Sequence, residues 1–374
     1  MKLTIQKNRL VEALRLLQAA APAAGALPIC GGVKIEADAD APVTMRATNL
    51  DVYATLEVDA DGVSEFGRAC VSAKRLGAVA AKLPDGAAEL WTDDANMVHV
   101  RGGAVHYRLG GLLPGEFPKE PKCRAGWRGA KLAAADFADL LGRAARCMST
   151  DDTRKVLMGA MLETDLVDGA QSLRAVATDG RGLACATCAT ETCIGGLEAL
   201  VPARSVEALV RLVGEGKDVQ LRIDGSGRLF ADCGPVRASV GLNADIYPNW
   251  GRVVPETAGR AVVAVDSAAL LAAVSRVALV CDDPYSAVTL VLSGDALKVK
   301  GGAEQGGGEF AEDALPVEYE GVDTTMAFSA GLLADQLRSA GAGATLVFSE
   351  GTAGAEPLVI RSPGYTGVLM PLRK

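Results

Sequence analysis

Three aspartates are the residues best suited to catalytic chemistry in this chain. Asp151 and Asp152 are adjacent, and Asp179 precedes a glycine in a tight polar turn. Carboxylates grouped in this way bind the divalent ions of metal-dependent hydrolases. No basic or nucleophilic motif accompanies them, so we interpret these residues as a loop that faces solvent or caps a helix. A metal-dependent hydrolase using Asp151, Asp152 and Asp179 is the competing hypothesis.

A cysteine cluster is the second candidate site. Cys185 and Cys188 form a Cys-x-x-Cys pair and Cys193 follows, a spacing found at zinc and redox sites. A zinc site needs a fourth ligand, and the two histidines of the chain, His99 and His106, are distant in sequence. We therefore expect small buried residues of a strand here, with no metal and no cofactor. The nine cysteines of the chain are expected as free thiols.

Basic residues are placed more regularly than the carboxylates. Every predicted helix carries at least one, on the helix or at its edge: Lys7, Arg9, Arg15, Lys74, Arg75, Lys82, Arg143, Arg146, Arg204, Arg211, Arg276 and Arg338. A solvated helix face would explain each of them alone. The formal net charge of −8 argues against nucleic acid coating the whole surface. It is compatible with one basic face that contacts phosphates without reading bases.

An internal repeat positions these residues. Thr178 and Asp179, in a strand–turn–strand pattern over residues 173–184, align with Thr48 and Asn49, and positions 178 and 48 differ by 130. The pattern Gly-Leu, four residues, an aromatic residue and Pro occurs at 111–118 and again at 241–248, at the same offset. The segments 72–74 and 202–204, which open two predicted helices, also match at this offset. Three matches at one offset predict repeated domains.

Three predicted helices share one kind of apolar face. Apolar or small residues recur at i, i+3, i+4 and i+7 in three segments: Leu10, Ala13, Leu14 and Leu17; Phe137, Leu140, Leu141 and Ala144; and Leu270, Ala273, Val274 and Val277. Asp136 and Asp266 stand where a helix N-cap is expected. The chain is therefore predicted to contain three copies of a unit of about 125 residues.

The order of elements within one copy predicts the fold class. In the first copy we expect strands at 1–5, 33–36, 43–47, 89–91, 97–101 and 106–109, and helices at 9–18 and 74–83. Paired strands with two separated helices predict an α+β fold with antiparallel sheets. The predicted linkers are residues 123–128 and 255–260. No apolar run approaches the roughly 18 residues that span a membrane, and we expect a cytoplasmic protein.

The chain resembles the β subunit of bacterial DNA polymerase III, the sliding clamp family, over its whole length. The matching segments are Leu27-Pro28-Ile29, Leu83-Pro84-Asp85-Gly86, Val176-Ala177-Thr178-Asp179-Gly180, Leu200-Val201-Pro202, Tyr247-Pro248, Arg252-Val253-Val254-Pro255 and Val368-Leu369-Met370-Pro371-Leu372-Arg373. The resemblance implies three similar clamp domains, at 1–124, 125–255 and 256–374. It also implies a ring of two chains arranged head to tail, with helices lining the hole and antiparallel sheets outside.

The resemblance further implies the function and its sites. Such a homodimeric ring has no catalytic residues; it encircles duplex DNA without sequence preference and tethers DNA polymerase subunits, the clamp loader and other proteins with a clamp-binding motif. Partners insert a short peptide into an apolar cleft between the second and third domains. Carried over to this chain, the cleft consists of Arg154, Leu157, Thr178, Gly180, Arg181, Leu183, Pro248, Arg252, Val253, Val368, Met370, Pro371 and Leu372. We expect DNA contacts at Lys74, Arg75, Arg146 and Arg204, and a dimer interface between Tyr107 and Leu109 of one chain and Leu279 and Val280 of the next.

Three departures from the family pattern bear on DNA and partner binding. Arg181 and Gly182 stand where the family often has His-Arg after the Asp-Gly. Ala24 and Ala26 flank the place of a common DNA-contacting Arg. Asp151 and Asp152 lie on a loop expected near the hole. These departures leave open a specialised clamp of a plasmid, phage or accessory operon. A DNA-binding repressor is a further alternative, but no recognition motif is visible.

Overall fold

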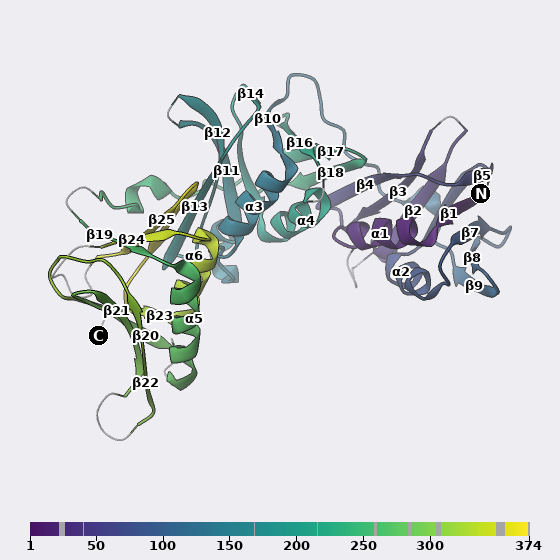
Figure 1. Ribbon diagram of the computed structural model, residues 1–374. Helices are drawn as coiled ribbons and strands as arrows, with labels where there is room; N and C mark the ends of the chain where they lie inside the picture. Colours follow the sequence, from purple (N-terminus) through teal and green to yellow (C-terminus); the bar gives the residue numbers. More distant parts are fainter. Residues whose placement is uncertain are drawn as a thin grey trace. The chain divides into compact units, whose positions relative to one another are not determined.

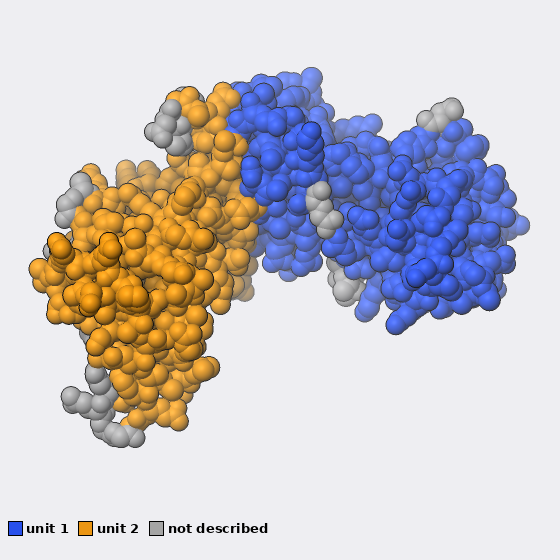
Figure 2. Space-filling model, viewed as in Figure 1, with its two compact units in different colours: residues 1–138, 190–243 blue, residues 139–189, 244–374 orange. Residues whose placement is uncertain are grey.

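The computed structural model (Figure 1) describes residues 1–21, 27–39, 41–167, 169–214, 216–257, 260–282, 286–303, 308–348 and 356–372. Ala24, Ala26 and Arg373 lie outside these residues. The chain forms two compact units, which Figure 2 shows in different colours. Unit 1 comprises Met1–Ala138 and Thr190–Asn243, and unit 2 comprises Asp139–Ala189 and Ala244–Lys374. The chain passes from unit 1 to unit 2 within helix α3 (Ala134–Ala145).

Unit 1 contains two antiparallel sheets. The five-stranded sheet has the order β5 (Gly62–Glu65), β1 (Lys2–Gln6), β7 (Ala87–Thr92), β8 (Met97–Gly102) and β9 (Val105–Gly110). The nine-stranded sheet has the order β14 (Thr192–Ile194), β10 (Arg128–Ala133), β16 (Asp218–Ile223), β17 (Arg228–Cys233), β18 (Val236–Gly241), β4 (Val52–Val58), β3 (Val43–Thr48), β2 (Gly32–Ala37) and β6 (Gly67–Ser72). The other elements of unit 1 are α1 (Lys7–Leu17), α2 (Ala73–Lys82), α4 (Ala203–Val213), β15 (Glu198–Pro202) and the 3-10 turns η1 (Pro28–Gly31) and η2 (Pro114–Glu116).

The apolar periodicity of the sequence explains the core of unit 1. On α1, Leu10, Ala13, Leu14 and Leu17 are all buried, which confirms the predicted apolar face. Helices α1 and α2 pack against each other, and α1 also contacts β3 and β4 (Figure 1). Strand β16 alternates half-buried and buried residues, as a strand does when one of its faces lies on the core. The helices therefore cover one face of the nine-stranded sheet.

Unit 2 also contains antiparallel sheets. Seven of its strands pair in the order β11 (Gly159–Val167), β12 (Ala170–Thr178), β13 (Gly182–Ala189), β26 (Tyr365–Leu369), β25 (Leu358–Ser362), β24 (Ala344–Phe348) and β19 (Ala261–Val265). Four more pair in the order β22 (Phe310–Pro316), β21 (Ala296–Gly302), β20 (Ala287–Ser293) and β23 (Thr324–Ser329). The helices are α5 (Ser267–Val277) and α6 (Ala330–Ala340), which pack side by side (Figure 1), with the 3-10 turns η3 (Asp152–Leu157), η4 (Trp250–Val253) and η5 (Ala278–Val280).

Strands from different copies of the repeat share sheets. In unit 1, β4 pairs with β18 in antiparallel register, so that Val52 lies opposite Val240. In unit 2, β13 pairs with β26, and Leu183 lies opposite Val368. Cross-strand pairs of this kind are the elementary stabilising contacts of a sheet. Each compact unit therefore contains strands from more than one copy of the repeat.

The two predicted helix caps have different outcomes. Asp266 accepts hydrogen bonds from the backbone N–H groups of Ala268 (2.9 Å) and Ala269 (3.2 Å), so its role as the N-cap of α5 is confirmed. The prediction for Asp136 was wrong. Helix α3 begins at Ala134, directly after the last residue of β10, and Asp136 lies in its first turn. A carboxylate there still interacts favourably with the helix dipole.

The connection between the first two repeats is longer than the predicted linker 123–128. In this fully described stretch, no helix or strand lies between η2 and β10, which begins at Arg128. Pro118 and Pro121 have no N–H to donate to a sheet, which is one reason why the segment forms no strand. The second predicted linker, 255–260, precedes β19, and its residues 258–259 lie outside the described chain. Across the described ranges, no helix is both long and apolar enough to cross a bilayer.

Candidate functional site

The candidate site begins at the tight turn that joins β12 to β13. The Thr178 hydroxyl donates to the Gly182 carbonyl (2.6 Å) and accepts from the Gly180 N–H (3.1 Å). One Asp179 carboxylate oxygen accepts from the N–H groups of Arg181 (2.8 Å) and Gly182 (2.7 Å). Gly180 has φ +88°, a conformation that glycine adopts without steric cost. The predicted strand–turn–strand is confirmed, and the Asp179 carboxylate is used to hold the backbone.

The same turn recurs 130 residues earlier, in unit 1. The Thr48 hydroxyl donates to the Val52 carbonyl (2.8 Å) and accepts from the Leu50 N–H (2.9 Å). The side-chain oxygen of Asn49 accepts from the Val52 N–H (2.7 Å), as Asp179 does from Gly182. The repeat inferred from the sequence therefore extends to individual hydrogen bonds. One position differs, because Leu50 stands where the later copy has glycine and adopts φ +79°.

Leu50 is therefore a strained residue, and its strain is measurable. A side chain in the left-handed region costs about 1–2 kcal/mol, whereas glycine normally destabilises by about 0.5–1 kcal/mol relative to alanine. We expect Leu50→Gly to be more stable than Leu50→Ala by about 1 kcal/mol in denaturant unfolding. The same pair of substitutions at Asp51, which does not have a positive φ, is the control and should give the opposite order. The same order at Leu50 as at Asp51, with the alanine variant more stable than the glycine variant, would show that the turn holds no strain.

The floor of the site is the junction of β13 and β26. Leu183 and Val368 lie opposite each other across this pair and are both buried. Beyond the end of β26, the Met370 N–H donates to the Arg181 carbonyl (2.9 Å). Met370 itself is 46% exposed, so its side chain is available to a ligand. This junction therefore combines buried apolar residues with one exposed apolar side chain at its edge.

The buried side-chain amide of Gln336 stabilises the junction of β13 and β26. Gln336 on α6 is 1% exposed, and its Nε2 donates to the carbonyls of Leu183 (3.1 Å) and Val368 (3.4 Å). Its Oε1 accepts from the Tyr365 hydroxyl (2.7 Å), and its Nε2 also donates to the Cys147 sulfur (3.2 Å). Burial raises the pKa of the Cys147 thiol to about 12, so this cysteine is a neutral thiol rather than a nucleophile. One side chain thus holds the two floor strands in register.

None of these supporting residues was predicted from the sequence. The available signal was a polar residue on the buried face of α6, where Gln336 lies among Leu333, Ala334, Leu337 and Ala340. The network also accounts for two nearby glycines. A Cβ at Gly367 would collide with Gln336 Oε1, and a Cβ at Gly182 would lie 3.2 Å from Gln336 Nε2. Gly182 is one of the departures from the family pattern, and a side chain at this position would come close to the Gln336 amide.

The remaining predicted cleft residues differ in burial and in their contacts. All thirteen predicted residues belong to unit 2. The Arg154 guanidinium donates to the Asp179 carbonyl (3.4 Å), which ties η3 to the turn. Leu157 is buried, whereas Pro248, Arg252 and Val253 are exposed, Val253 by 55%. Pro371 and Leu372 are half-buried, and the Leu372 N–H donates to the Ala327 carbonyl (2.7 Å).

The three aspartates serve local structure. Asp151 accepts from the N–H (3.0 Å) and the hydroxyl (2.7 Å) of Thr153 and caps η3, so the interpretation as a helix cap is confirmed. Asp179 is held in the turn, and Asp152 is exposed. Within the described ranges, no three His, Cys, Asp or Glu side chains are grouped to hold a metal ion. This arrangement does not favour the hydrolase hypothesis.

Cys185 and Cys188 lie in a strand, as expected. Both belong to β13, and residues three apart on a strand point to opposite faces of the sheet. Cys185 is buried and Cys188 is half-buried. The spacing that resembles a zinc motif in the sequence therefore separates the two thiols in space.

The candidate DNA-contacting residues are exposed cations. Lys74 and Arg75 lie on α2, Arg204 lies on α4, and Arg146 follows α3 directly. None of the four has an ion-pair partner among the residues that the structure describes. Cations on the strands are commonly paired instead, as Arg174 is with Glu163 (3.0 Å) and Asp165 (2.5 Å).

The candidate dimer residues lie at two separate edges. Tyr107 and Leu109 are half-buried on β9, an edge strand of the five-stranded sheet in unit 1. Leu279 and Val280 belong to η5 in unit 2, and Leu279 is 82% exposed.

Known proteins resemble the chain along its whole length. The N-terminal domain of the DNA polymerase III beta subunit matches residues 1–121, the central domain residues 131–249 and the C-terminal domain residues 251–371. The beta sliding clamps of Caulobacter vibrioides (strain NA1000 / CB15N) and Proteus mirabilis are 27% and 26% identical, with 100% of each chain covered.

Solved structures agree with these matches. A DNA polymerase sliding clamp from Caulobacter crescentus superposes with a TM-score of 0.85 at 26% identity. A DNA polymerase III subunit beta from Pseudomonas aeruginosa bound to griselimycin superposes with a TM-score of 0.89 at 25% identity. Both comparisons cover 100% of each chain. The predicted family and the α+β clamp fold are confirmed. The chain belongs to the DNA polymerase III beta subunit family, the family of the bacterial beta sliding clamps.

Proposed function

We propose that the chain works as a DNA sliding clamp, a ring of two copies that encircles duplex DNA and tethers DNA polymerase subunits, the clamp loader and other proteins with a clamp-binding motif. The relatives named beta sliding clamp support this, because those of Proteus mirabilis and Caulobacter vibrioides match the chain from end to end. A clamp acts by topology and tethering, so the proposal includes no catalytic step, no cofactor and a cytoplasmic location. The three repeats are proposed as domains 1–124, 125–255 and 256–374, and the matched ranges 1–121, 131–249 and 251–371 fall close to these boundaries.

The distribution of positive charge is the observation that supports the proposed DNA contact. Lys74, Arg75, Arg146 and Arg204 are exposed without ion-pair partners in the described chain, although the protein as a whole has a net charge of −8. Cations that are not neutralised by neighbouring carboxylates are available to phosphates. Such contacts position a duplex without reading its sequence, which is what a sliding ring requires.

Two open sheet edges support closure of the ring. Strand β9 ends the five-stranded sheet and β22 ends the four-stranded sheet, so each has one side without a strand partner in the described chain. Open edges of this kind pair readily with another chain. We infer that β9 of one copy meets β22 and η5 of the next. Because the two surfaces differ, the contact is heterologous, and a ring forms where two copies close on each other.

DNA binding is expected to be weak, independent of sequence and strongly dependent on salt. Replacing Lys74, Arg75, Arg146 and Arg204 with alanine should lower the magnitude of the slope of log K against log salt, by about one for each cation that neutralises a phosphate. Arg101→Ala on β8, an exposed cation outside the proposed DNA contacts, should leave the slope unchanged. The protein should stay on circular DNA and leave it after linearisation. Tight binding to one sequence that survives high salt would exclude a sliding clamp.

A further inference from the structure

A polar cavity lies on the nine-stranded sheet of unit 1, beside β17 and β18. It has a volume of about 400 Å³ and is bordered on one side by residues 120–123 of the segment that leads to β10. Its charged lining residues are Arg46, Glu120, Lys122, Arg222, Asp232 and Arg237. Cross-strand pairing puts Asp232 opposite Arg237, so their side chains share one face of the sheet. The proposed clamp function does not use this cavity.

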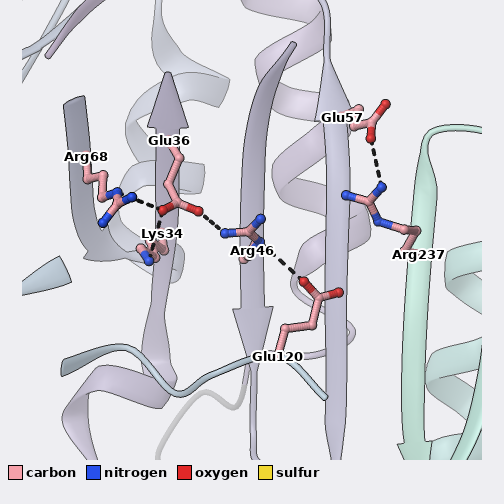
Figure 3. Close-up of polar contacts among 7 residues, drawn as sticks. All are labelled: Lys34, Glu36, Arg46, Glu57, Arg68, Glu120 and Arg237. Atoms are coloured by element: carbon pink, nitrogen blue, oxygen red, sulfur yellow. Dashed lines mark hydrogen bonds and ion pairs between the residues drawn. The ribbon is translucent and has the colours of Figure 1, made fainter. Parts of the chain in front are cut away.

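Positive charge is concentrated beside the cavity around one carboxylate. The Glu36 side chain is nearly buried, and Lys34 Nζ (3.1 Å), Arg68 Nε (2.9 Å) and Arg46 Nη1 all contact its oxygens (Figure 3). Burial lowers the pKa of Lys34, and the charges of Arg46 and Arg68 lower it further. Three cations therefore contact the Glu36 carboxylate at this edge of the cavity.

On the other side of the cavity, cations also pair with carboxylates. Arg237 pairs with Glu57 (3.0 Å), and Arg222 pairs with Asp232 and lies over the Trp127 ring (5.8 Å). Lys122 is exposed and has no ion-pair partner among the described residues. Cations outnumber carboxylates by six (Lys34, Arg46, Arg68, Lys122, Arg222 and Arg237) to four (Glu36, Glu57, Glu120 and Asp232).

The guanidinium groups at the cavity also have unused hydrogen-bonding capacity. The Nε atoms of Arg46 and Arg222 are buried and have no hydrogen-bond acceptor in the described chain. A buried donor without an acceptor is unfavourable, and both of these residues line the cavity. Glu120 approaches Arg46 Nε to 3.5 Å, an ion pair that is not aligned as a hydrogen bond (Figure 3). A carboxylate ligand in the place of Glu120 would accept from Arg46 Nε, which the described residues leave without an acceptor.

Glu120 indicates which anion fits. It is a carboxylate supplied by a connecting segment rather than by the sheet, and it already occupies the side of the cavity next to Arg46. Single-stranded nucleic acid would need exposed aromatic rings on which its bases stack. Among the described lining residues the aromatic one is Phe230, which is buried, and the half-buried Trp127 ring nearby already has the Arg222 guanidinium over it. We propose that this cavity binds an acidic peptide segment of a partner protein, whose carboxylates displace Glu120 from Arg46.

The probe for this proposal is a fluorescently labelled hexaglutamate peptide, followed by anisotropy with the full-length protein at low salt. Lys122→Ala and Arg237→Ala should each weaken binding about tenfold, and Glu120→Gln should strengthen it severalfold because the competing carboxylate is removed. Lys122 has no structural partner among the described residues, so that variant reports on binding without a risk to folding.

Matched controls separate this site from general electrostatic attraction. Glu116→Gln and Arg211→Ala remove exposed charges elsewhere in unit 1, and they should change hexaglutamate affinity by less than about twofold. Deletion of residues 370–374 should leave hexaglutamate binding unchanged, because the clamp peptide site is separate. Equal effects of Glu120→Gln and Glu116→Gln would overturn the proposal. So would a six-nucleotide thymidine oligonucleotide that binds the cavity more tightly than hexaglutamate.

Discussion

Removal of residues 370–374 is expected to abolish binding of a clamp-binding peptide and to leave the dimer intact. Met370 and Leu372 lie on a segment that is anchored to the site by backbone hydrogen bonds to Arg181 and Ala327. Burying one Met or Leu side chain contributes about 1.5–3 kcal/mol. The binding free energy of a micromolar complex is roughly 8 kcal/mol, and losing both side chains removes at least about 3 kcal/mol of it. This loss corresponds to a more than hundredfold decrease in affinity. The deletion removes no residue of β9, β22 or η5, which carry the proposed dimer contacts.

Calorimetry with a peptide that carries one Gln and two or three large apolar side chains tests this prediction. Removal of residues 373–374 alone is the matched control and should preserve affinity. Met370→Glu keeps the backbone hydrogen bonds and provides a second variant in case the deletion unfolds. Equal affinity of the wild type and the 370–374 deletion would exclude a cleft at this location. Peptide selectivity should differ from that of clamps with His-Arg after the Asp-Gly, because Arg181 and Gly182 stand there in this chain.

The double substitution Leu279→Glu with Val280→Glu is expected to convert the dimer into a monomer. Leu279 is 82% exposed in the single chain, and a partner surface would bury it. Burying two unpaired carboxylates costs several kcal/mol, so we expect the dimer dissociation constant to rise by about 1,000-fold or more. The variant should also lose retention on circular DNA, because an open chain cannot encircle it.

Sedimentation velocity at micromolar concentration measures this change directly. Val262→Glu on β19 is the control, since Val262 is also an exposed apolar residue (58%) but lies outside the proposed interface. It should remain a dimer. A double variant that still sediments as a dimer would show that η5 does not form the interface, whatever its effect on DNA.

Local patterns in the sequence were sufficient for the repeat, the helices and the key turn. The apolar faces of α1 and α5 follow from a 3.6-residue period, and the predicted buried residues, such as Leu14 and Val274, are buried. Thr178 and Asp179 form their turn with partners within four residues, so neighbours along the chain determine it. The same holds for Thr48 and Asn49, which is why the repeat was visible as a sequence offset.

Contacts between distant segments could not be derived in this way. Gln336 is 153 residues from Leu183. Nothing near Gln336 in the sequence indicates that its side-chain amide would donate hydrogen bonds to strands β13 and β26. The pairing of β4 with β18 joins residues about 180 positions apart. The ion pairs of Glu36 with Lys34, Arg46 and Arg68 form only because strands β2, β3 and β6 lie side by side. Period and spacing determine which face of an element is apolar. Which elements then meet, and which polar groups must be satisfied where they do, is decided by the packing of the whole chain.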